Sequence, residues 1–173
     1  MSKIESHGYS LWLQPESQVF ERFANIIRDL AGQHGGPIFE PHVTLLGEVA
    51  APDQPEKDVV EKTKAIVEGR KLVSVYLTEI DFQDYYFRTL YVLADRSPEL
   101  LGLYDRALEV FGREFSPYMP HLSLMYGDYT VELKKQIISE IGRQRAEFVA
   151  TGIHVIKSTG DESTWAKVAF IPF

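Results

Sequence analysis

The chain has 173 residues, of which 45% are hydrophobic and 25% charged, and its formal net charge at pH 7 is −7. This length and composition predict a globular protein, which we expect to form a single bilobal domain over residues 1–173. The absence of cysteine from the sequence excludes disulfides, thiolate metal sites and a cysteine nucleophile. The net negative charge predicts that the protein has no basic face for binding long nucleic acid. It is compatible with a small nucleotide-like ligand in a local pocket.

The sequence has no apolar run that approaches the roughly 20 residues needed to span a bilayer. Residues 1–6 also lack the apolar core of a signal peptide. We therefore expect a cytoplasmic protein that has no membrane partner and is a monomer.

Five elements are predicted in the first half of the chain. Residues 16–31 carry Phe20, Phe23, Ile27 and Leu30 at spacings of three and four, which indicates an amphipathic helix. The glycine-rich loop that ends this helix matches no phosphate-binding pattern. In chain order the elements are a strand over 8–14, the helix over 16–31, a strand over 38–49, a helix over 56–68 and a strand over 71–82.

The second half repeats this order. Ser97, Pro98 and Gly112 are typical of the N-cap, the first position and the stop of a helix. Thr130 is expected to cap another helix. The elements are a strand over 87–94, a helix over 98–111, a strand over 121–126, a helix from 130 to about 143, and strands over 147–157 and 164–170. The order predicts an α+β fold in which two antiparallel sheets face a central cleft, with the helices outside.

Two pentapeptides of the chain share one pattern, Pro-His-apolar-hydroxyl-Leu. Side chains two residues apart lie on the same face of a strand, so His42 and Thr44 point one way, and His121 and Ser123 do the same on the second strand. Each strand therefore presents an imidazole beside a hydroxyl. The apolar residues of the two motifs point the other way, into the core: Val43, Leu45, Leu122 and Leu124.

The two motifs belong to a longer repeat. The motif histidines are 79 residues apart, and the same offset aligns residues 10–13 with 89–92 and residues 73–77 with 152–156. We interpret the chain as two copies of one strand–helix–strand–helix–strand unit, related by a pseudo-two-fold axis. This symmetry predicts that the two histidines face each other across a cleft.

Two facing histidines suit the opening of a cyclic phosphate by water. Histidine titrates near neutrality, so one imidazole can take a proton from water while the other protonates the departing oxygen. Thr44 and Ser123 can donate hydrogen bonds to the phosphoryl oxygens held between the imidazoles. This chemistry requires neither a metal nor another cofactor, and the carboxylate clusters of two-metal phosphoesterases are absent from the sequence.

The paired motifs resemble those of the 2H phosphoesterase superfamily, and most closely those of its cyclic phosphodiesterase branch, known from plants and yeast. Residues 9–12 resemble the opening strand of that branch and residues 39–44 its first motif. Residues 117–124, with 126–127, resemble its second motif nearly residue for residue. The resemblance spans essentially the whole chain and implies a bilobal fold. Plant members carry cysteines, so any disulfide-linked behaviour does not transfer to this chain.

The resemblance also implies an activity. It implies hydrolysis of ADP-ribose 1″,2″-cyclic phosphate to ADP-ribose 1″-phosphate, a product of the tRNA splicing pathway. Nucleoside 2′,3′-cyclic phosphates are expected to open to 2′-phosphates as well. The residues carried over as catalytic are His42, Thr44, His121 and Ser123, with His121 as the base and His42 as the acid.

Aromatic residues are expected near the substrate. The resemblance carries over Trp12 and Tyr126 as substrate-binding groups. Tyr86 and Phe87 lie at the turn into the strand that matches the Trp12 strand; we take Phe87 as a substrate contact, with core packing as the alternative. Arg88 follows the aromatic run where plant members carry glutamine, so the resemblance leaves its role and the substrate preference open. The other histidines lack a hydroxyl partner at the motif spacing and are expected to be structural or on the surface: His7, His34 and His154.

Three other functions remain open from the sequence. An RNA-end 2′,3′-cyclic phosphodiesterase or 2′-5′ RNA ligase-like enzyme would share the site, but it needs a basic track for the RNA strand, and the net charge argues against one. A non-catalytic nucleotide-binding module would keep the cleft without needing both imidazoles. A two-histidine metal site would need further ligands, and the sequence shows no His, Asp or Glu cluster at ligand spacing.

Overall fold

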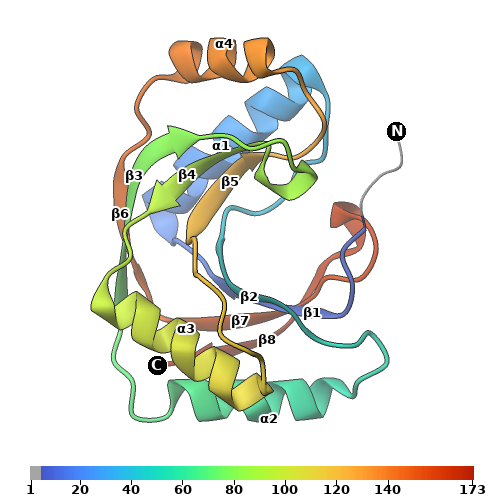
Figure 1. Ribbon diagram of the computed structural model, residues 1–173, viewed down its shortest axis with the longest axis vertical. Helices are drawn as coiled ribbons and strands as arrows, with labels where there is room; N and C mark the ends of the chain where they lie inside the picture. Colours follow the sequence, from blue (N-terminus) through green and yellow to red (C-terminus); the bar gives the residue numbers. More distant parts are fainter. Residues whose placement is uncertain (1–4) are drawn as a thin grey trace.

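The structure, a computed structural model, describes residues 5–173 (Figure 1). In chain order the elements are β1 (Tyr9–Leu13), α1 (Ser17–His34), β2 (Val43–Ala50), α2 (Glu56–Val67), β3 (Val73–Asp81), the 3-10 helix η1 (Tyr86–Arg88), β4 (Leu90–Ala94), α3 (Pro98–Phe111), β5 (His121–Met125), α4 (Val131–Ile141), β6 (Ala146–Ala150), β7 (Gly152–Lys157), the 3-10 helix η2 (Glu162–Thr164) and β8 (Ala166–Pro172). This order confirms the predicted α+β fold class.

All eight strands belong to one antiparallel sheet with the order β6-β3-β4-β5-β2-β1-β7-β8. The sheet is strongly curled, and its two halves enclose the space at the centre of Figure 1. The two sheets expected from the sequence are these two halves, β6-β3-β4-β5 and β2-β1-β7-β8. They join at a narrow seam, where Val43 of β2 pairs with Leu122 of β5.

The halves of the sheet are built in the same order, as the repeat predicts. Reading outward from the seam, β2, β1 and β7 in one half correspond to β5, β4 and β3 in the other. These are the strand pairs that the 79-residue offset aligns. The third strand of each unit crosses over, because β3 pairs with β4 and β6, whereas β7 pairs with β1 and β8. Each half of the sheet therefore contains a strand from the other sequence repeat.

The apolar residues of the two motifs form the centre of the hydrophobic core, as predicted. Val43 and Leu122 have exposed fractions of 0%, and Leu45 and Leu124 are equally well buried. Helices cover the outside of the sheet: α1 packs on β5 and β6, α2 on β7 and β8, and α3 on β2. The core holds the two motif strands together and leaves their opposite faces to the cleft.

Two helix starts agree with the predicted caps. The Ser97 hydroxyl accepts a hydrogen bond from the Leu100 amide, and the Thr130 hydroxyl accepts one from the Leu133 amide. Gly112 ends α3 in the left-handed conformation, with φ at 62°, which glycine adopts without strain.

Several element boundaries differ from the prediction, and the strand expected over 38–49, for example, begins at Val43. The strand expected over 147–157 is two strands, because β6 pairs with β3 and β7 pairs with β1, in opposite halves of the sheet. The strand expected over 87–94 begins as the 3-10 helix η1. Helix α1 continues through Gly32 to His34 and ends at Gly35, where φ is 80°.

The helices of residues 5–173 were also compared with the requirements of a membrane span. Within that range no helix combines the length and the hydropathy that crossing a bilayer takes.

Candidate active site

His42 immediately precedes β2 and His121 is the first residue of the adjacent strand β5, and the two histidines share one hydrogen-bonding arrangement. The Nδ1 atom of His42 lies 2.7 Å from the Glu40 carbonyl oxygen, and the Nδ1 atom of His121 lies 2.8 Å from the Met119 carbonyl oxygen. Because a carbonyl oxygen only accepts, Nδ1 is the donor in both cases. The Nε2 atom of each ring is therefore the one that remains to accept or donate a proton.

The seam between the halves places each histidine near the hydroxyl of the other repeat. Val43 is paired with Leu122, and antiparallel strands run in opposite directions from such a pair. Stepping one residue along each strand brings His42 opposite Ser123 and Thr44 opposite His121. The four side chains predicted to be catalytic thus converge on one small region of the sheet face.

An aromatic side chain lies against each histidine. The Trp12 ring stacks on the His42 ring, with centroids 3.5 Å apart and planes 4° apart. The Tyr91 ring meets the His121 ring edge-on at 5.1 Å. Trp12 pairs with Thr44 across β1 and β2, and Tyr91 pairs with Ser123 across β4 and β5. Trp12 was predicted near the substrate; Tyr91 was not, although the repeat aligns it with Trp12.

The two histidines, their hydroxyl partners and Trp12 line a cleft with a volume of about 390 Å³, and Tyr91 lies behind its wall. All seven residues that the sequence predicted for the site are in its wall: Trp12, His42, Thr44, Phe87, His121, Ser123 and Tyr126. Tyr126 belongs to the wall although its position falls on the other face from His121 by strict alternation. Strand β5 ends at Met125, so the alternation does not extend to Tyr126.

An aromatic cluster, defined here as Phe39, Tyr86, Phe87, Tyr126 and Trp165, packs beside the cleft. Its members Phe87, Tyr126 and Trp165 are in the cleft wall. Phe39 stacks on Tyr126 at 3.9 Å, and Phe87 meets Tyr126 edge-on at 5.3 Å. Trp165 lies 5.7 Å from Trp12 and 6.2 Å from Phe87, measured between ring centroids. Sequence analysis missed Trp165; its signal was that it is one of two tryptophans in the chain.

The two motif hydroxyls differ in their hydrogen bonding. Ser123 Oγ donates to the Phe87 carbonyl oxygen at 3.1 Å. The Thr44 hydroxyl has no hydrogen-bond partner within residues 5–173, while the Thr44 carbonyl accepts from the Tyr118 hydroxyl at 2.9 Å. Thr44 can therefore donate to a ligand as it stands, whereas the Ser123 hydroxyl must first give up its bond to the Phe87 carbonyl oxygen.

Burial lowers the pKa of both motif histidines. Burial lowers the pKa of His42 to about 3, against the raising effect of the hydrogen bond to the Glu40 carbonyl, and the neighbouring His121 lowers it further. Burial also lowers the pKa of His121, against the raising effect of its bond to Met119, and the charge of Arg88 acts in the same direction as burial. An anion bound between the rings would favour the protonated imidazole and raise both pKa values.

This geometry was compared with known proteins. The family model described as "Cyclic phosphodiesterase-like protein" matches residues 7–169. The chain belongs to this family.

Two curated relatives of this cyclic phosphodiesterase-like protein carry related names. A cyclic phosphodiesterase of Arabidopsis thaliana is 27% identical over 136 residues, which cover 78% of this chain and 74% of that protein. A 2′,3′-cyclic-nucleotide 3′-phosphodiesterase of Yarrowia lipolytica is 27% identical over 157 residues, which cover 82% of this chain and 67% of that protein. Together with the family match, they confirm the resemblance to the cyclic phosphodiesterase branch.

Solved structures of Escherichia coli LigT share the fold. The complex with phosphate aligns with a TM-score of 0.60 at 11% sequence identity, covering 98% of this chain and 99% of LigT. The complex with 3′-AMP aligns with a TM-score of 0.61 at 11% identity over the same shares of the two chains. At this identity the likeness shows only that the chain shares the fold of LigT.

The remaining ionisable groups of this cyclic phosphodiesterase-like protein do not extend the site into a metal centre. Within residues 5–173, no group of three or more His, Asp or Glu side chains is arranged to hold a metal ion. His154 pairs with Trp12 across β1 and β7 but lies outside the cleft wall, with its ring 4.6 Å from that of Phe170. His7 is exposed and His34 is in the last turn of α1, also outside the cleft wall.

Proposed function

We propose that this protein is a metal-independent cyclic phosphodiesterase. It opens nucleoside 2′,3′-cyclic phosphates to 2′-phosphates and ADP-ribose 1″,2″-cyclic phosphate to ADP-ribose 1″-phosphate. The family match supports hydrolysis of a phosphodiester bond. The observation that carries the mechanism is the pair of imidazoles on adjacent strands, each with Nδ1 tied to a carbonyl and both in the wall of one cleft.

Catalysis uses the two Nε2 atoms in opposite protonation states. His121 Nε2 removes a proton from water as the water oxygen bonds to phosphorus. The bond from phosphorus to the departing ribose oxygen breaks on the opposite side, and His42, protonated, gives that oxygen a proton. The reaction leaves His121 protonated and His42 neutral, so solvent must return both to their starting states before the next turnover.

His42 takes up its proton from solvent when the substrate binds. Its pKa of about 3 in the empty cleft leaves the ring neutral near pH 7. A cyclic phosphate carries one negative charge, and its binding beside His42 stabilises the imidazolium. The substrate therefore promotes formation of the acid that acts on it.

The motif hydroxyls and the aromatic side chains complete the site. Thr44 and Ser123 donate to the two non-bridging phosphoryl oxygens and stabilise the charge that grows on them in the transition state. Trp12 keeps the His42 ring in place by stacking on it. The aromatic cluster offers Tyr126, Phe87 and Trp165 as surfaces for a base or ribose.

The experiment that tests this proposal is product analysis with purified protein and excess chelator. The substrates are adenosine 2′,3′-cyclic phosphate, ADP-ribose 1″,2″-cyclic phosphate and a short RNA with a cyclic end. We expect both small substrates to open with chelator present, the adenosine substrate to the 2′-phosphate. Turnover that stops with chelator and returns with zinc would establish a metal site instead. Turnover of the RNA end alone would establish the RNA-end activity, and ligand binding without turnover would establish a binding module.

A further inference from the structure

The side chains at the two ends of the cleft differ in chemical character, although the repeat makes the backbones of the two ends equivalent. The end beside His42 is covered by Trp12 and Trp165. At the end beside His121, Tyr91 takes the place of Trp12 against the histidine ring. Arg88 and Tyr85, from the loop before β4, line the cleft at this end. One end is therefore aromatic and the other is cationic.

Arg88 is the one lysine or arginine among the described residues that line the cleft. Its side chain is half-buried, and its guanidinium carbon lies 5.7 Å from the centroid of the Tyr85 ring. Within residues 5–173, the guanidinium has neither a carboxylate within ion-pair distance nor a hydrogen-bond partner. A half-buried guanidinium pays a desolvation cost that an anion normally offsets. Its setting thus favours an anionic ligand as the missing partner.

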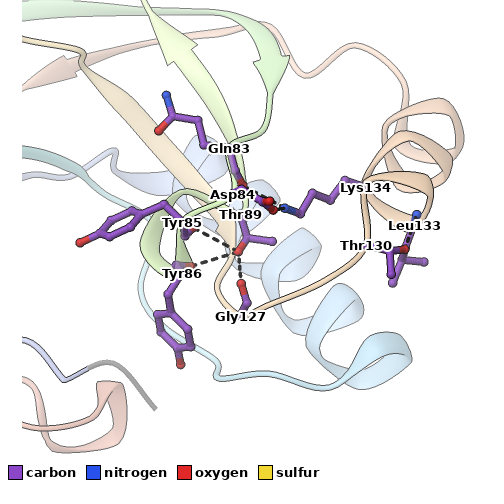
Figure 2. Close-up of polar contacts among 9 residues, drawn as sticks. All are labelled: Gln83, Asp84, Tyr85, Tyr86, Thr89, Gly127, Thr130, Leu133 and Lys134. Carbon is purple, nitrogen blue, oxygen red and sulfur yellow. Dashed lines mark hydrogen bonds and ion pairs between the residues drawn. The ribbon is translucent and has the colours of Figure 1, made fainter. Parts of the chain in front are cut away.

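The loop that carries Arg88 is held in place rather than loose. The Arg88 carbonyl accepts from the Gln83 amide and the Arg88 amide donates to the Tyr85 carbonyl, both at 2.9 Å, which closes the loop on itself. Figure 2 shows Lys134 reaching from α4 to this loop, where its Nζ atom donates to the Gln83 carbonyl at 2.9 Å and to Asp84 Oδ1 at 3.0 Å.

Thr89 fixes the other end of the loop. Its hydroxyl lies within hydrogen-bonding distance of the carbonyl oxygens of Tyr85, Tyr86 and Gly127, as the dashed lines in Figure 2 show, and its one proton is shared among these acceptors. The Gly127 amide donates to the Tyr86 carbonyl at 3.1 Å. Arg88 is therefore preorganised at the edge of the cleft, which lowers the entropy cost of binding an anion there.

The symmetry of the fold separates Arg88 from the groups that hold the cyclic phosphate. Those groups occur twice, as His42 with Thr44 and His121 with Ser123. Arg88 occurs once, because the 79-residue offset places it over Tyr9, which is a core residue with an exposed fraction of 1%. A residue that breaks the symmetry suits a part of the substrate that lies at one end of the cleft.

We propose that Arg88 binds a second anionic group of the substrate, a phosphate or pyrophosphate carried by the same ribose as the cyclic phosphate. This inference rests on the proposed function and deepens it, because it names the residue that recognises the pyrophosphate of ADP-ribose 1″,2″-cyclic phosphate or the 5′-phosphate of a nucleotide. The guanidinium presents its fork of N–H donors to two oxygens of that group, a geometry that suits phosphate. Substrates with a phosphorylated 5′ position are then preferred over those with a free 5′-hydroxyl.

The test compares adenosine 2′,3′-cyclic phosphate with its 5′-phosphorylated form at constant ionic strength. For the wild-type protein we expect kcat/KM to be at least about tenfold higher for the 5′-phosphorylated substrate, the size of one charge-assisted contact. Arg88→Gln should remove this preference through KM, whereas any effect of the lost charge on the pKa of His121 should change the two substrates equally. Arg88→Lys should keep part of it. Arg96→Gln makes the same change of net charge at an exposed position outside the cleft and should behave as the wild type.

Other results would overturn the inference. One is a wild-type protein without preference for the 5′-phosphate; another is a preference that survives in Arg88→Gln. An equal loss on both substrates would place Arg88 at the cyclic phosphate instead. Calorimetry with adenosine 2′-phosphate and adenosine 2′,5′-bisphosphate gives a readout independent of turnover. If neither substrate is opened but the bisphosphate binds more tightly in an Arg88-dependent way, the proposed function fails and the anion site stands. Equal binding of the two ligands would refute the anion site.

Discussion

Val43 of β2 lies directly opposite Leu122 of β5, and this pair joins the two halves of the curled sheet. Each residue follows a motif histidine, and each is fully buried. The pairing therefore does two things at once. It closes the core across the seam, and it sets the register that brings each imidazole near the hydroxyl of the other repeat.

Shortening the Leu122 side chain tests whether the packing of the core and the geometry of the active site depend on the same residue pair. Leu122→Ala should lower the free energy of unfolding by about 2–5 kcal/mol, since it leaves a cavity in a packed core. It should also lower turnover of the folded protein, because the motif strands lose the contact that sets their spacing. Urea unfolding gives the first quantity and kcat the second. Leu72→Ala, at a leucine that is 58% exposed, is the control and should change neither. Unchanged turnover in folded Leu122→Ala would show that the Val43–Leu122 pair does not set the geometry of the active site.

Loss of the Thr44 hydroxyl and loss of the Ser123 hydroxyl should differ in their effect on stability, because Ser123 makes a hydrogen bond within the protein. Thr44→Val and Ser123→Ala should each lower kcat by about 10²–10³-fold, the usual cost of losing one donor to a developing oxyanion. Ser123→Ala should also lower the free energy of unfolding by about 1 kcal/mol, because it breaks the bond to the Phe87 carbonyl. Thr44→Val breaks no hydrogen bond of its own side chain. Equal stability losses in the two variants would contradict this difference.

The pH profile should differ between kcat/KM and kcat. Catalysis needs one imidazole protonated and one neutral, so each profile is bell-shaped. The profile of kcat/KM reports the free enzyme, in which the pKa values of His42 and His121 are both lowered. The protonated form is thus lost as the pH rises through these values, and the maximum of kcat/KM should lie below pH 6.5. Bound substrate raises the pKa values, so the maximum of kcat should lie at higher pH. Coincident maxima above pH 7 would contradict this account.

The buried Lys134 should act on substrate preference through the Arg88 loop. Lys134→Met removes the donor to the Gln83 carbonyl and to Asp84, so the loop loses its link to α4. We expect the preference for a 5′-phosphorylated substrate to fall toward that of Arg88→Gln, with an accompanying loss of about 1–3 kcal/mol in the free energy of unfolding. Lys135→Met, at the exposed neighbouring position, is the matched control. A full preference in Lys134→Met would show that the loop keeps its shape without this contact.

Much of the fold could be predicted from local pattern. The caps at Ser97 and Thr130 and the stop at Gly112 act through nearest neighbours along the chain, so the sequence is sufficient for them. The repeat offset identified equivalent strands because both copies kept the alternation of polar and apolar residues. The predicted fold class and family were confirmed.

The crossing of β3 and β7 could not be predicted in this way. Both strands are apolar enough to pair in either half, and the choice depends on contacts distant in sequence. The same holds for Trp165, which reaches the site through ring packing rather than a motif. Tyr91 is different, because the repeat offset aligns it with Trp12 and could have indicated it. The catalytic roles of the motif residues stay predictions, and so does the single-domain organisation.

The most direct test of the central claim is the turnover of His42→Ala and His121→Ala on adenosine 2′,3′-cyclic phosphate. Each variant should lose about 10²–10⁴-fold in kcat while it unfolds cooperatively like the wild type, since each lacks one partner in proton transfer. The double variant should lose little more than either single one, because the two imidazoles act as a unit. His7→Ala, at an exposed histidine outside the cleft, should keep full activity. Near-normal turnover in either single variant would contradict proton transfer by the histidine pair.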